Sequence, residues 1–425
     1  MAMHLRFVSF VCLFSLLLLL SSCTSSDEFT GYSYDPEGVT NTTDKEIQEQ
    51  HKRTIGVSST GVWISNEFDG ARMNNFYRVK DSLYRVVIEP ENHPINNSPW
   101  YSFKIHSDSP QKIRLQLAYK HGKHRYFPKL SIDGEHWSPI PLSRIEADTA
   151  AGTATLTLDL YEEPLWVSAQ ELLTFDDMQQ WADSISTSAS VAKLDTVGYS
   201  HNNRPILKIS AVQNISTRNR GVLIITGRQH PPEVTGGLAS QYFIETMLND
   251  SELAKSFRDK FDILIYPVVN PDGVDNGHWR HNGAGIDLNR DWEHFNQPET
   301  KAIRDDLLPL TNDSSRTVYY GIDFHSTNEN IFYPINRDIS TFPEDFTYGW
   351  IDTLIKAAPD MPINVEPFPP NSPIAKNWIY HTFGADAVTY EVDDAADRKK
   401  LEEISRQTAQ IIMRQLLEEW NKNKK

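Results

Sequence analysis

Cysteine is almost absent from this chain of 425 residues, which contains only Cys12 and Cys23. Cys12 lies inside an apolar run near the N-terminus, so a mature chain that loses this run keeps at most one cysteine. An intramolecular disulfide is then excluded even in an oxidising compartment. Burial of apolar side chains must therefore stabilise the fold, and a chain of this length can bury them in two domains.

A run of apolar residues long enough to span a bilayer is also missing near the N-terminus. The largely apolar run there covers residues 7–20, whereas a membrane-spanning helix needs about 20 residues. The run follows a single basic residue, Arg6, and these features are typical of the core of a signal peptide.

The residues that end this run, Leu20-Ser-Ser-Cys23, resemble the box of bacterial lipoproteins, in which the cysteine is acylated. We therefore expect residues 1–22 to be a lipoprotein signal peptide and Cys23 to be the lipidation site. The residue directly after this cysteine is Thr24 and not Asp, which resembles the lipoproteins that are sorted to an outer membrane. The expected location is extracytoplasmic, periplasmic or surface-exposed, with membrane contact through the lipid; the alternative is an ordinary secretory signal.

Basic residues are in the minority, with 41 Lys and Arg against 57 Asp and Glu and a formal net charge of −16. This balance argues against nucleic acid or an anionic membrane surface as a partner. An acidic substrate would need a site that is locally positive. The sequence does not define an oligomeric state.

A metalloprotease helix of the HExxH type does not occur in the sequence, which excludes a thermolysin-type zinc site. Four apolar runs instead read as core strands of an α/β sheet. They are residues 221–227, 261–269, 317–323 and 385–390. Because ligands bind outside the carboxyl ends of such strands, the residues that end these runs are the first candidates for a site.

His230 and Glu233 follow the first run, His325 follows the third, and Glu391 follows the fourth. Imidazole and carboxylate groups bind zinc, and a catalytic site commonly uses three protein ligands. We interpret His230, Glu233 and His325 as ligands of one Zn²⁺ and Glu391 as a base beside the open position. Each residue alone could be an ordinary solvated or hydrogen-bonded loop residue. Their appearance together, each after a predicted strand, favours a metal site.

Further motifs resemble those of the M14 zinc carboxypeptidases over roughly residues 190–420. These motifs are Asn270-Pro-Asp-Gly273, Arg280, residues 285–290, His230-Pro-Pro-Glu233, residues 323–326 and residues 389–391. The resemblance implies hydrolysis of a C-terminal peptide bond by a zinc-bound water, which Glu391 would activate.

The same resemblance implies roles for four residues between the second and third strands. Arg280 would stabilise the oxyanion formed on the scissile carbonyl. Asn289 and Arg290 would hold the terminal carboxylate of the substrate, a task that suits a planar guanidinium. Asp287 would accept the second ring hydrogen of a zinc-binding histidine. For the two arginines the alternative is an exposed charge on a loop.

Two departures from the family pattern concern the substrate pocket. Lys376 lies two residues before Trp378, where the family often has the residue that sets side-chain preference. A cation there would favour a terminal glutamate, whereas the alternative is a solvent-facing loop lysine. The proline-rich residues 366–373 contain no tyrosine for a mobile lid, so Tyr333 or Tyr380 would have to substitute.

The order of segments predicts two domains after a tether. Residues 23–52 are polar and read as a flexible tether. Residues 53–167 contain alternating runs that predict a smaller, antiparallel all-β sandwich, similar to the domain that precedes the catalytic one in the cytosolic carboxypeptidase branch. Residues 168–425 predict a mixed central sheet with helices on both faces. The expected helices are 172–185, 234–248, 299–308, 344–357 and 401–420, and a strand or hairpin is expected at 194–212.

Three functions are compatible with these features. The first is a zinc carboxypeptidase that acts on peptides outside the cytoplasm, with a preference for acidic terminal residues. The second is a related amidase that cuts cell-wall (murein) peptides. The third is a non-catalytic surface binding protein that uses the sandwich, although the intact set of Glu391, Arg280 and the metal ligands argues against it.

Overall fold

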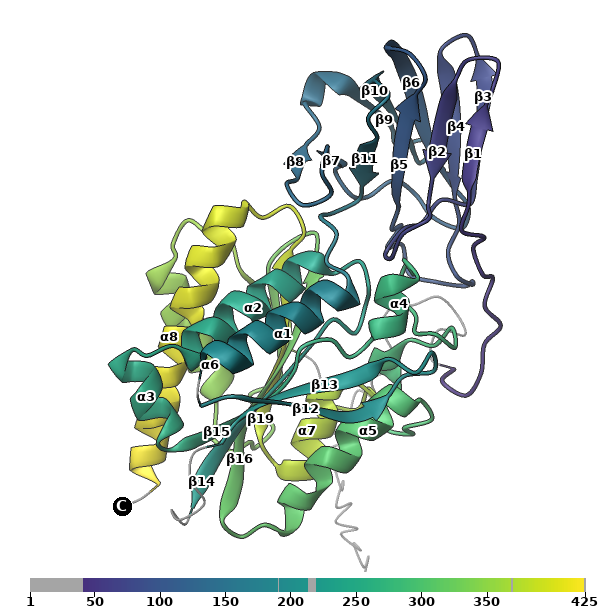
Figure 1. The fold of residues 1–425 in the computed structure, drawn as a ribbon. Helices are drawn as coiled ribbons and strands as arrows, with labels where there is room; N and C mark the ends of the chain where they lie inside the picture. Colours follow the sequence, from purple (N-terminus) through teal and green to yellow (C-terminus); the bar gives the residue numbers. More distant parts are fainter. Residues whose placement is uncertain (1–40, 190, 213–218, 368–369, 424–425) are drawn as a thin grey trace, which may run out of the picture.

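The chain folds into two units, one above the other in Figure 1. The structure, a computed structural model, describes residues 41–189, 191–212, 219–367 and 370–423. The predicted signal peptide, the lipidation site Cys23 and residues 24–40 of the predicted tether lie outside the described residues. Among the described residues, no helix combines the length and the apolar character needed to cross a membrane.

The first unit, here called the β-unit, covers residues 54–168 and contains two sheets. One sheet has the order β1-β2-β5-β11-β7-β8 and the other β3-β4-β6-β10-β9. The strands are β1 Thr54–Val57, β2 Val62–Ser65, β3 Asn75–Lys80, β4 Leu83–Ile88, β5 Ser102–Ser107, β6 Gln111–Tyr119, β7 Lys129–Ser131, β8 Ser138–Pro139, β9 Ile145–Asp148, β10 Thr153–Leu160 and β11 Leu165–Ser168, with a short 3₁₀ turn η1 at Leu142–Arg144.

The two sheets of the β-unit enclose one apolar core. Side chains of β10 alternate strictly between buried and half-buried, as expected for a strand with one face toward a core. Phe103 of one sheet and Leu115 and Leu156 of the other belong to the same buried cluster. Burying each such side chain stabilises the fold by about 1.5–3 kcal/mol.

One pairing in the β-unit differs from the predicted antiparallel arrangement, because β4 and β6 run parallel. The strand between them in the sequence, β5, belongs to the opposite sheet. The chain therefore crosses from one sheet to the other and back, and such a crossover connection lets β6 join β4 in the same direction. The boundary between the two predicted domains stays a prediction.

The second unit, here called the α/β-unit, covers residues 175–422 and has the sheet order β12-β13-β15-β14-β16-β19-β17-β18. The strands are β12 Lys193–Tyr199, β13 Pro205–Ala211, β14 Arg220–Gly227, β15 Phe261–Tyr266, β16 Arg316–Thr327, β17 Ile331–Pro334, β18 Asn364–Val365 and β19 Asp386–Asp393. The central strands β15, β14, β16 and β19 are parallel, whereas β12/β13, β13/β15 and β17/β19 are antiparallel. The predicted mixed sheet is confirmed.

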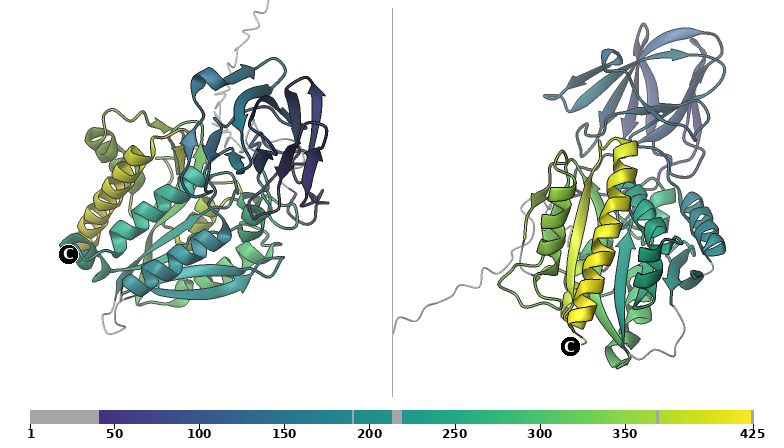
Figure 2. Two further views of the ribbon diagram at one scale, coloured as in Figure 1. Left: turned by 45° about the horizontal axis from the view of Figure 1, so that its top comes forward. Right: turned by 90° about the vertical axis from the view of Figure 1, so that its left-hand side faces the viewer.

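Helices cover both faces of this sheet, as predicted. One face packs against α1 Phe175–Ser188, α2 Val234–Leu248, α3 Glu252–Arg258, α6 Phe346–Ala357 and α8 Arg398–Lys422, and α8 is in front in the right-hand view of Figure 2. The other face packs against α5 Pro298–Leu307 and α7 Ala375–Phe383. Short turns are α4 Pro271–Asp275, η2 Leu288–Arg290 and η3 Leu308–Asn312.

The expected helices and the hairpin are all present, with helix ends within three residues of the expected positions. Helix α1 begins after Thr174, whose side chain and that of Asp177 form a capping box. Besides the five-residue α4, two helices, α3 and α7, were not expected. Both are short, at seven and nine residues, and too brief to display a clear period of 3.6.

Candidate metal centre and active site

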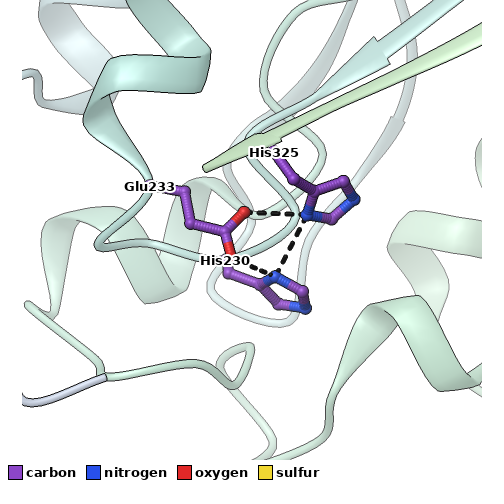
Figure 3. A group of neighbouring side chains, drawn as sticks. All are labelled: His230, Glu233 and His325. Atoms are coloured by element: carbon purple, nitrogen blue, oxygen red, sulfur yellow. Dashed lines mark hydrogen bonds and ion pairs between the residues drawn. The ribbon is translucent and has the colours of Figure 1, made fainter. Parts of the chain in front are cut away.

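Three predicted ligands come together at the carboxyl edge of the central sheet (Figure 3). His230 and Glu233 lie in the turn between β14 and α2, and His325 lies near the end of β16. Helix α2 can approach β16 closely because Gly236 has no Cβ; an added Cβ would collide with the backbone carbonyl of His325. The local fold thus brings residues that are far apart in the sequence to one point.

The two imidazoles and the carboxylate face each other through specific atoms. His230 Nδ1 lies 2.7 Å from Glu233 Oε1, and His325 Nδ1 lies 2.7 Å from Glu233 Oε2. The two Nδ1 atoms are 3.2 Å apart. All three side chains are buried, and in Figure 3 the carboxylate of Glu233 points between the two rings.

The opposite edge of each ring is held by a second carboxylate. Asp287 Oδ1 lies 3.1 Å from His230 Nε2, and Asp323 Oδ2 lies 2.7 Å from His325 Nε2. When a cation occupies the space between the rings, each Nε2 would carry the ring hydrogen and donate it to its aspartate, which leaves a lone pair on each Nδ1 for the cation. This arrangement is the carboxylate–histidine pairing that orients metal-binding imidazoles.

The donor set therefore fits a cation. Two bare imidazole nitrogens and a carboxylate that converge within about 3 Å would repel one another without a positive charge between them. Without such an ion, the carboxylates of Asp323 and Glu233 outweigh burial and raise the pKa of His325 well above its ordinary value, so that a proton takes this place. Two nitrogens and one carboxylate, with one position left open, suit zinc.

Asp323 is a functional residue to which the sequence analysis gave no role. It lies two residues before His325 on β16, and alternate residues of a strand share a face. Its other oxygen accepts a hydrogen bond of 2.7 Å from Thr226, and Gln229 donates to the oxygen that faces His325. An acidic residue two positions before a strand-borne histidine is the signal that could have revealed it.

The predicted base, Glu391, lies on the strand next to His325. In the pairing of β16 with β19, His325 and Glu391 are directly opposite each other. Glu391 Oε2 is buried and has no hydrogen-bond partner among the described residues. Burial and the charge of Glu233 raise the pKa of Glu391 to about 7, against the lowering effect of the two histidines. The carboxylate is therefore a stronger base than an exposed glutamate.

A cavity of about 480 Å³ opens over these groups. Besides His230, Glu233 and Glu391, its wall includes Arg280, Asn289 and Arg290. The structure thus brings all the residues predicted for oxyanion and carboxylate binding to the same space as the metal ligands.

Arg280 is linked to the metal centre through Asp287. Arg280 Nε donates a hydrogen bond of 2.6 Å to Asp287 Oδ2, while the other oxygen of Asp287 faces His230. The charge of Arg280, followed by that of His230, outweighs burial and lowers the pKa of Asp287 well below its ordinary value. Asp287 therefore stays ionised and holds both neighbours in place.

Lys376 is not among the residues that line this cavity. It lies in α7, fully buried, and its ammonium donates a hydrogen bond of 3.1 Å to the carbonyl of Pro334. Pro334 follows Tyr333, which does line the cavity. The alternative of a solvent-facing loop lysine is wrong; the role in substrate preference stays a prediction. Of the two candidate tyrosines, only Tyr333 lines the cavity.

The β-unit supplies one wall of the cavity, which the sequence analysis did not foresee. Its contribution consists of Asn96, Asn97, Ser98 and Arg125. Arg125 donates a hydrogen bond of 2.7 Å to Asp394 of the α/β-unit, a few residues beyond Glu391. No local pattern marks these residues, because only the packing of the two units brings them to the site.

A buried glutamate of the β-unit also supports the loop that carries Arg280. Glu91 accepts backbone hydrogen bonds from three consecutive residues: Oε2 from Trp279 at 2.7 Å, and Oε1 from Arg280 at 3.1 Å and His281 at 2.8 Å. Burial alone would raise the pKa of Glu91, but nearby His278, His281 and Arg72 and the hydrogen bond from Trp279 lower it to about 2.

We expect Glu91→Gln to displace the Arg280 loop, because the amide nitrogen would face a backbone N–H. A misplacement of about 1 Å can cost up to about a hundredfold in rate, so kcat should fall about tenfold or more with zinc content unchanged. Peptide kinetics and metal analysis would check this. Glu89→Gln is the matched control, because Glu89 is a nearby glutamate of the β-unit whose side chain pairs with the exposed Lys120. An unchanged kcat in Glu91→Gln would contradict the support role.

The fold and the donor set together define a protein with a site suited to one metal ion at the edge of a mixed α/β sheet. Residues 178–392 match the model of the zinc carboxypeptidase family, peptidase family M14. The chain belongs to this family.

Relatives and solved structures agree with this assignment. Cytosolic carboxypeptidase 1 of Danio rerio is 32% identical over 338 residues, 68% of this chain and 29% of the relative. Cytosolic carboxypeptidase 3 of Mus musculus is 22% identical over 301 residues, which cover 62% of this chain and 29% of the relative. The matches thus span less than a third of the length of these relatives.

Among solved structures, a metallo-carboxypeptidase from Burkholderia cenocepacia superposes with a TM-score of 0.70 at 18% identity, covering 85% of this chain and 99% of that one. A metallo-carboxypeptidase from Pseudomonas aeruginosa superposes with a TM-score of 0.68 at 19% identity, covering 84% of this chain and 99% of that one. At these identities the likeness concerns the fold. Coverage of 85% exceeds the α/β-unit, so the likeness extends into the β-unit.

Proposed function

We propose that this chain is a zinc-dependent carboxypeptidase that releases the C-terminal residue of a peptide. The observation that carries the proposal is the convergence of His230 Nδ1, His325 Nδ1 and the Glu233 carboxylate, each ring fixed from behind by an aspartate. Family membership supports the reaction class. A peptide is the expected substrate, and the net charge of −16 argues against nucleic acid.

Each residue around the cavity has a defined task in this proposal. Zinc, when bound, supplies a Lewis acid that lowers the pKa of a water molecule and polarises the scissile carbonyl. Glu391 accepts the proton of the attacking water and passes it to the departing amine. Arg280, held by Asp287, stabilises the negative charge that develops on the carbonyl oxygen.

Asn289 and Arg290 would restrict cleavage to the C-terminal peptide bond, which makes the proposed enzyme an exopeptidase. Both line the cavity, and Arg290 Nη1 donates a hydrogen bond of 2.8 Å to the carbonyl of Asn289, which keeps its guanidinium close to the amide. A guanidinium and an amide together can bind both oxygens of a terminal carboxylate. A peptide whose C-terminus is amidated lacks this carboxylate.

A peptide panel tests the function. Blocked peptides that end in Glu, Lys or Phe, each also as the C-terminal amide, are incubated with the zinc-loaded protein and with protein treated with a chelator. We expect release of one residue from the free acids, no release from the amides, and no activity after chelation until zinc is restored. Hydrolysis of the amides, or of muropeptides alone, would replace this proposal with an endopeptidase or a cell-wall amidase.

The same panel tests a preference for an acidic terminal residue, which we infer from Lys376. Burial lowers the pKa of Lys376 to about 7 although the charge of Asp386 opposes this, and a substrate carboxylate nearby would favour the protonated, positively charged form. We expect Lys376→Met to reduce the ratio of kcat/KM for Glu over Phe peptides. Equal turnover of Glu and Phe peptides by the unaltered protein would remove this role.

We further propose an extracytoplasmic location with a lipid anchor at Cys23, a residue outside the described part of the chain. The proposal rests on the apolar run before Leu20-Ser-Ser-Cys23. Expression in a Gram-negative host with labelled palmitate should label the chain and place it in the membrane fraction. Cys23→Ala should abolish the label; labelling that persists in this variant would contradict the anchor.

A further inference from the structure

A second cavity, of about 530 Å³, lies where the β-unit meets the α/β-unit. The β-unit contributes Phe127, Trp137 and Pro139 to its wall, and the α/β-unit contributes Ala395 and Ala396. None of these residues has a task in the reaction proposed above. The cavity is therefore a candidate binding site beside the active site.

The second cavity adjoins the first, because the two have wall residues in common. Arg125 and Asn328 line both cavities. In contrast, Asn289 and Arg290 line the first cavity alone. The second cavity thus extends from the side of the active site that does not contain the residues proposed to hold the terminal carboxylate.

The two central strands lead from the reacting groups to this cavity. Strand β16 carries His325 and is followed by Asn328, while β19 carries Glu391 and ends at Asp393. A strand rises about 3.3 Å per residue, so the wall of the second cavity begins roughly 7–10 Å from the catalytic groups. An extended peptide covers this distance in about two to three residues.

The wall of the second cavity favours a neutral apolar side chain. Four basic and four acidic side chains line it, so their charges balance. Glu171 pairs with Lys129 and with Arg398, and Arg125 pairs with Asp394. Phe127, by contrast, is 38% exposed and lines the wall, and the half-buried Trp137 lines it as well. Exposed aromatic rings beside paired charges offer contacts to another aromatic or large apolar group.

We propose that this cavity binds the substrate upstream of the scissile bond and accepts an aromatic or large apolar side chain at the third or fourth residue from the C-terminus. The inference rests on the proposed carboxypeptidase function, since that function defines the direction of the peptide. It assigns to the β-unit a task in substrate selection. A run of glutamates upstream is not favoured, because the cavity carries no net positive charge.

Peptides that differ only upstream test this inference. Let X be the terminal residue that the panel above identifies as the best substrate. The probes are acetyl-Ala-X, acetyl-Gly-Gly-Gly-Ala-X, and versions of the longer peptide with Phe or Glu at the third or fourth position from the C-terminus. We expect kcat/KM for the Phe peptides to exceed that for the Gly peptide by about tenfold, which corresponds to about 1.4 kcal/mol.

Variants of the cavity wall locate the effect. Phe127→Ala and Trp137→Ala should reduce the ratio of kcat/KM for the Phe peptide over acetyl-Ala-X by about tenfold. Tyr161→Ala is the matched control, because Tyr161 is an aromatic residue of the β-unit that is 54% exposed and lines neither cavity. A ratio that stays the same in both wall variants, or a Glu peptide that exceeds the Phe peptide, would overturn the inference.

A binding measurement keeps this inference separate from the reaction itself. Calorimetry with the zinc-loaded Glu391→Gln protein should give a Kd about tenfold lower for the Phe peptide than for the Gly peptide. Selective binding without any hydrolysis by the unaltered protein would support the cavity and remove the proposed function. Hydrolysis together with equal binding of the Phe and Gly peptides would support the proposed function and overturn the inference about the cavity.

Discussion

Replacing Glu391 by Gln should lower kcat by about a hundredfold to ten-thousandfold, the range that a positioned general base contributes. The amide has the same shape but cannot accept the proton of the attacking water. The metal ligands lie on other segments, so zinc should still bind at one per chain. Peptide kinetics, metal analysis and a thermal melt would check the three expectations together.

The pH dependence of kcat/KM gives this prediction a second readout. The base acts only when it is ionised, so kcat/KM should rise with pH as Glu391 loses its proton. Its pKa is raised to about 7 without a metal, and a cation at the neighbouring cluster favours the ionised form. The midpoint should therefore lie between about 4.3, the ordinary value for glutamate, and about 7.

The matched control for this prediction is Glu403→Gln. Glu403 is an exposed glutamate of α8 that does not line the active-site cavity, so its kinetics should match those of the unaltered protein. A Glu391→Gln protein that keeps zinc and retains more than about a tenth of kcat would remove the general-base role. The base would then have to be sought among other residues of the cavity.

Replacing His325 by Ala should abolish zinc retention and, with it, activity. His325 is buried, supplies one of three converging ligand atoms and is held by Asp323. Loss of an outer hydrogen-bond partner alone lowers metal affinity by roughly 10–100-fold, and loss of a ligand must lower it further. After dialysis, the zinc content should fall from about one per chain to near zero.

The exposed residue His294 provides the control, since His294→Ala removes an imidazole without touching the cluster. This variant should keep both zinc and activity. Thermal melts of both variants in a chelator would separate metal loss from misfolding, because the comparison then involves only metal-free proteins. One zinc per chain and normal turnover in His325→Ala would contradict the assignment of the metal centre.

The central sheet and the metal centre could be predicted from the sequence because their signals are local. All eight residues of β14 are buried, and residues 221–225 of this strand form a continuous apolar run. The ligands follow such runs directly, and a parallel sheet places the carboxyl ends of its strands along one edge. The sequence therefore predicts that His230, Glu233 and His325 lie together.

Features that depend on packing between distant segments could not be predicted in this way. Arg125 reaches the cavity only because the β-unit lies over the carboxyl edge of the sheet. Glu91 supports the Arg280 loop across nearly 190 residues of sequence. Lys376 has the position expected from the family pattern, but it is buried in α7 and is not among the residues that line the cavity. In each case tertiary contacts determine the role of the residue, and these contacts cannot be predicted from residue type and spacing.

The register between β16 and β19 has a consequence for heat inactivation. His325 and Glu391 are opposite each other on adjacent strands, so the ladder of backbone hydrogen bonds sets the gap between ligand and base. A shift of one residue would turn Glu391 to the far side of the sheet, because neighbouring side chains alternate. Catalytic turnover therefore depends on the correct pairing of β16 with β19. On heating, we expect turnover to be lost as soon as the ends of these two strands begin to separate.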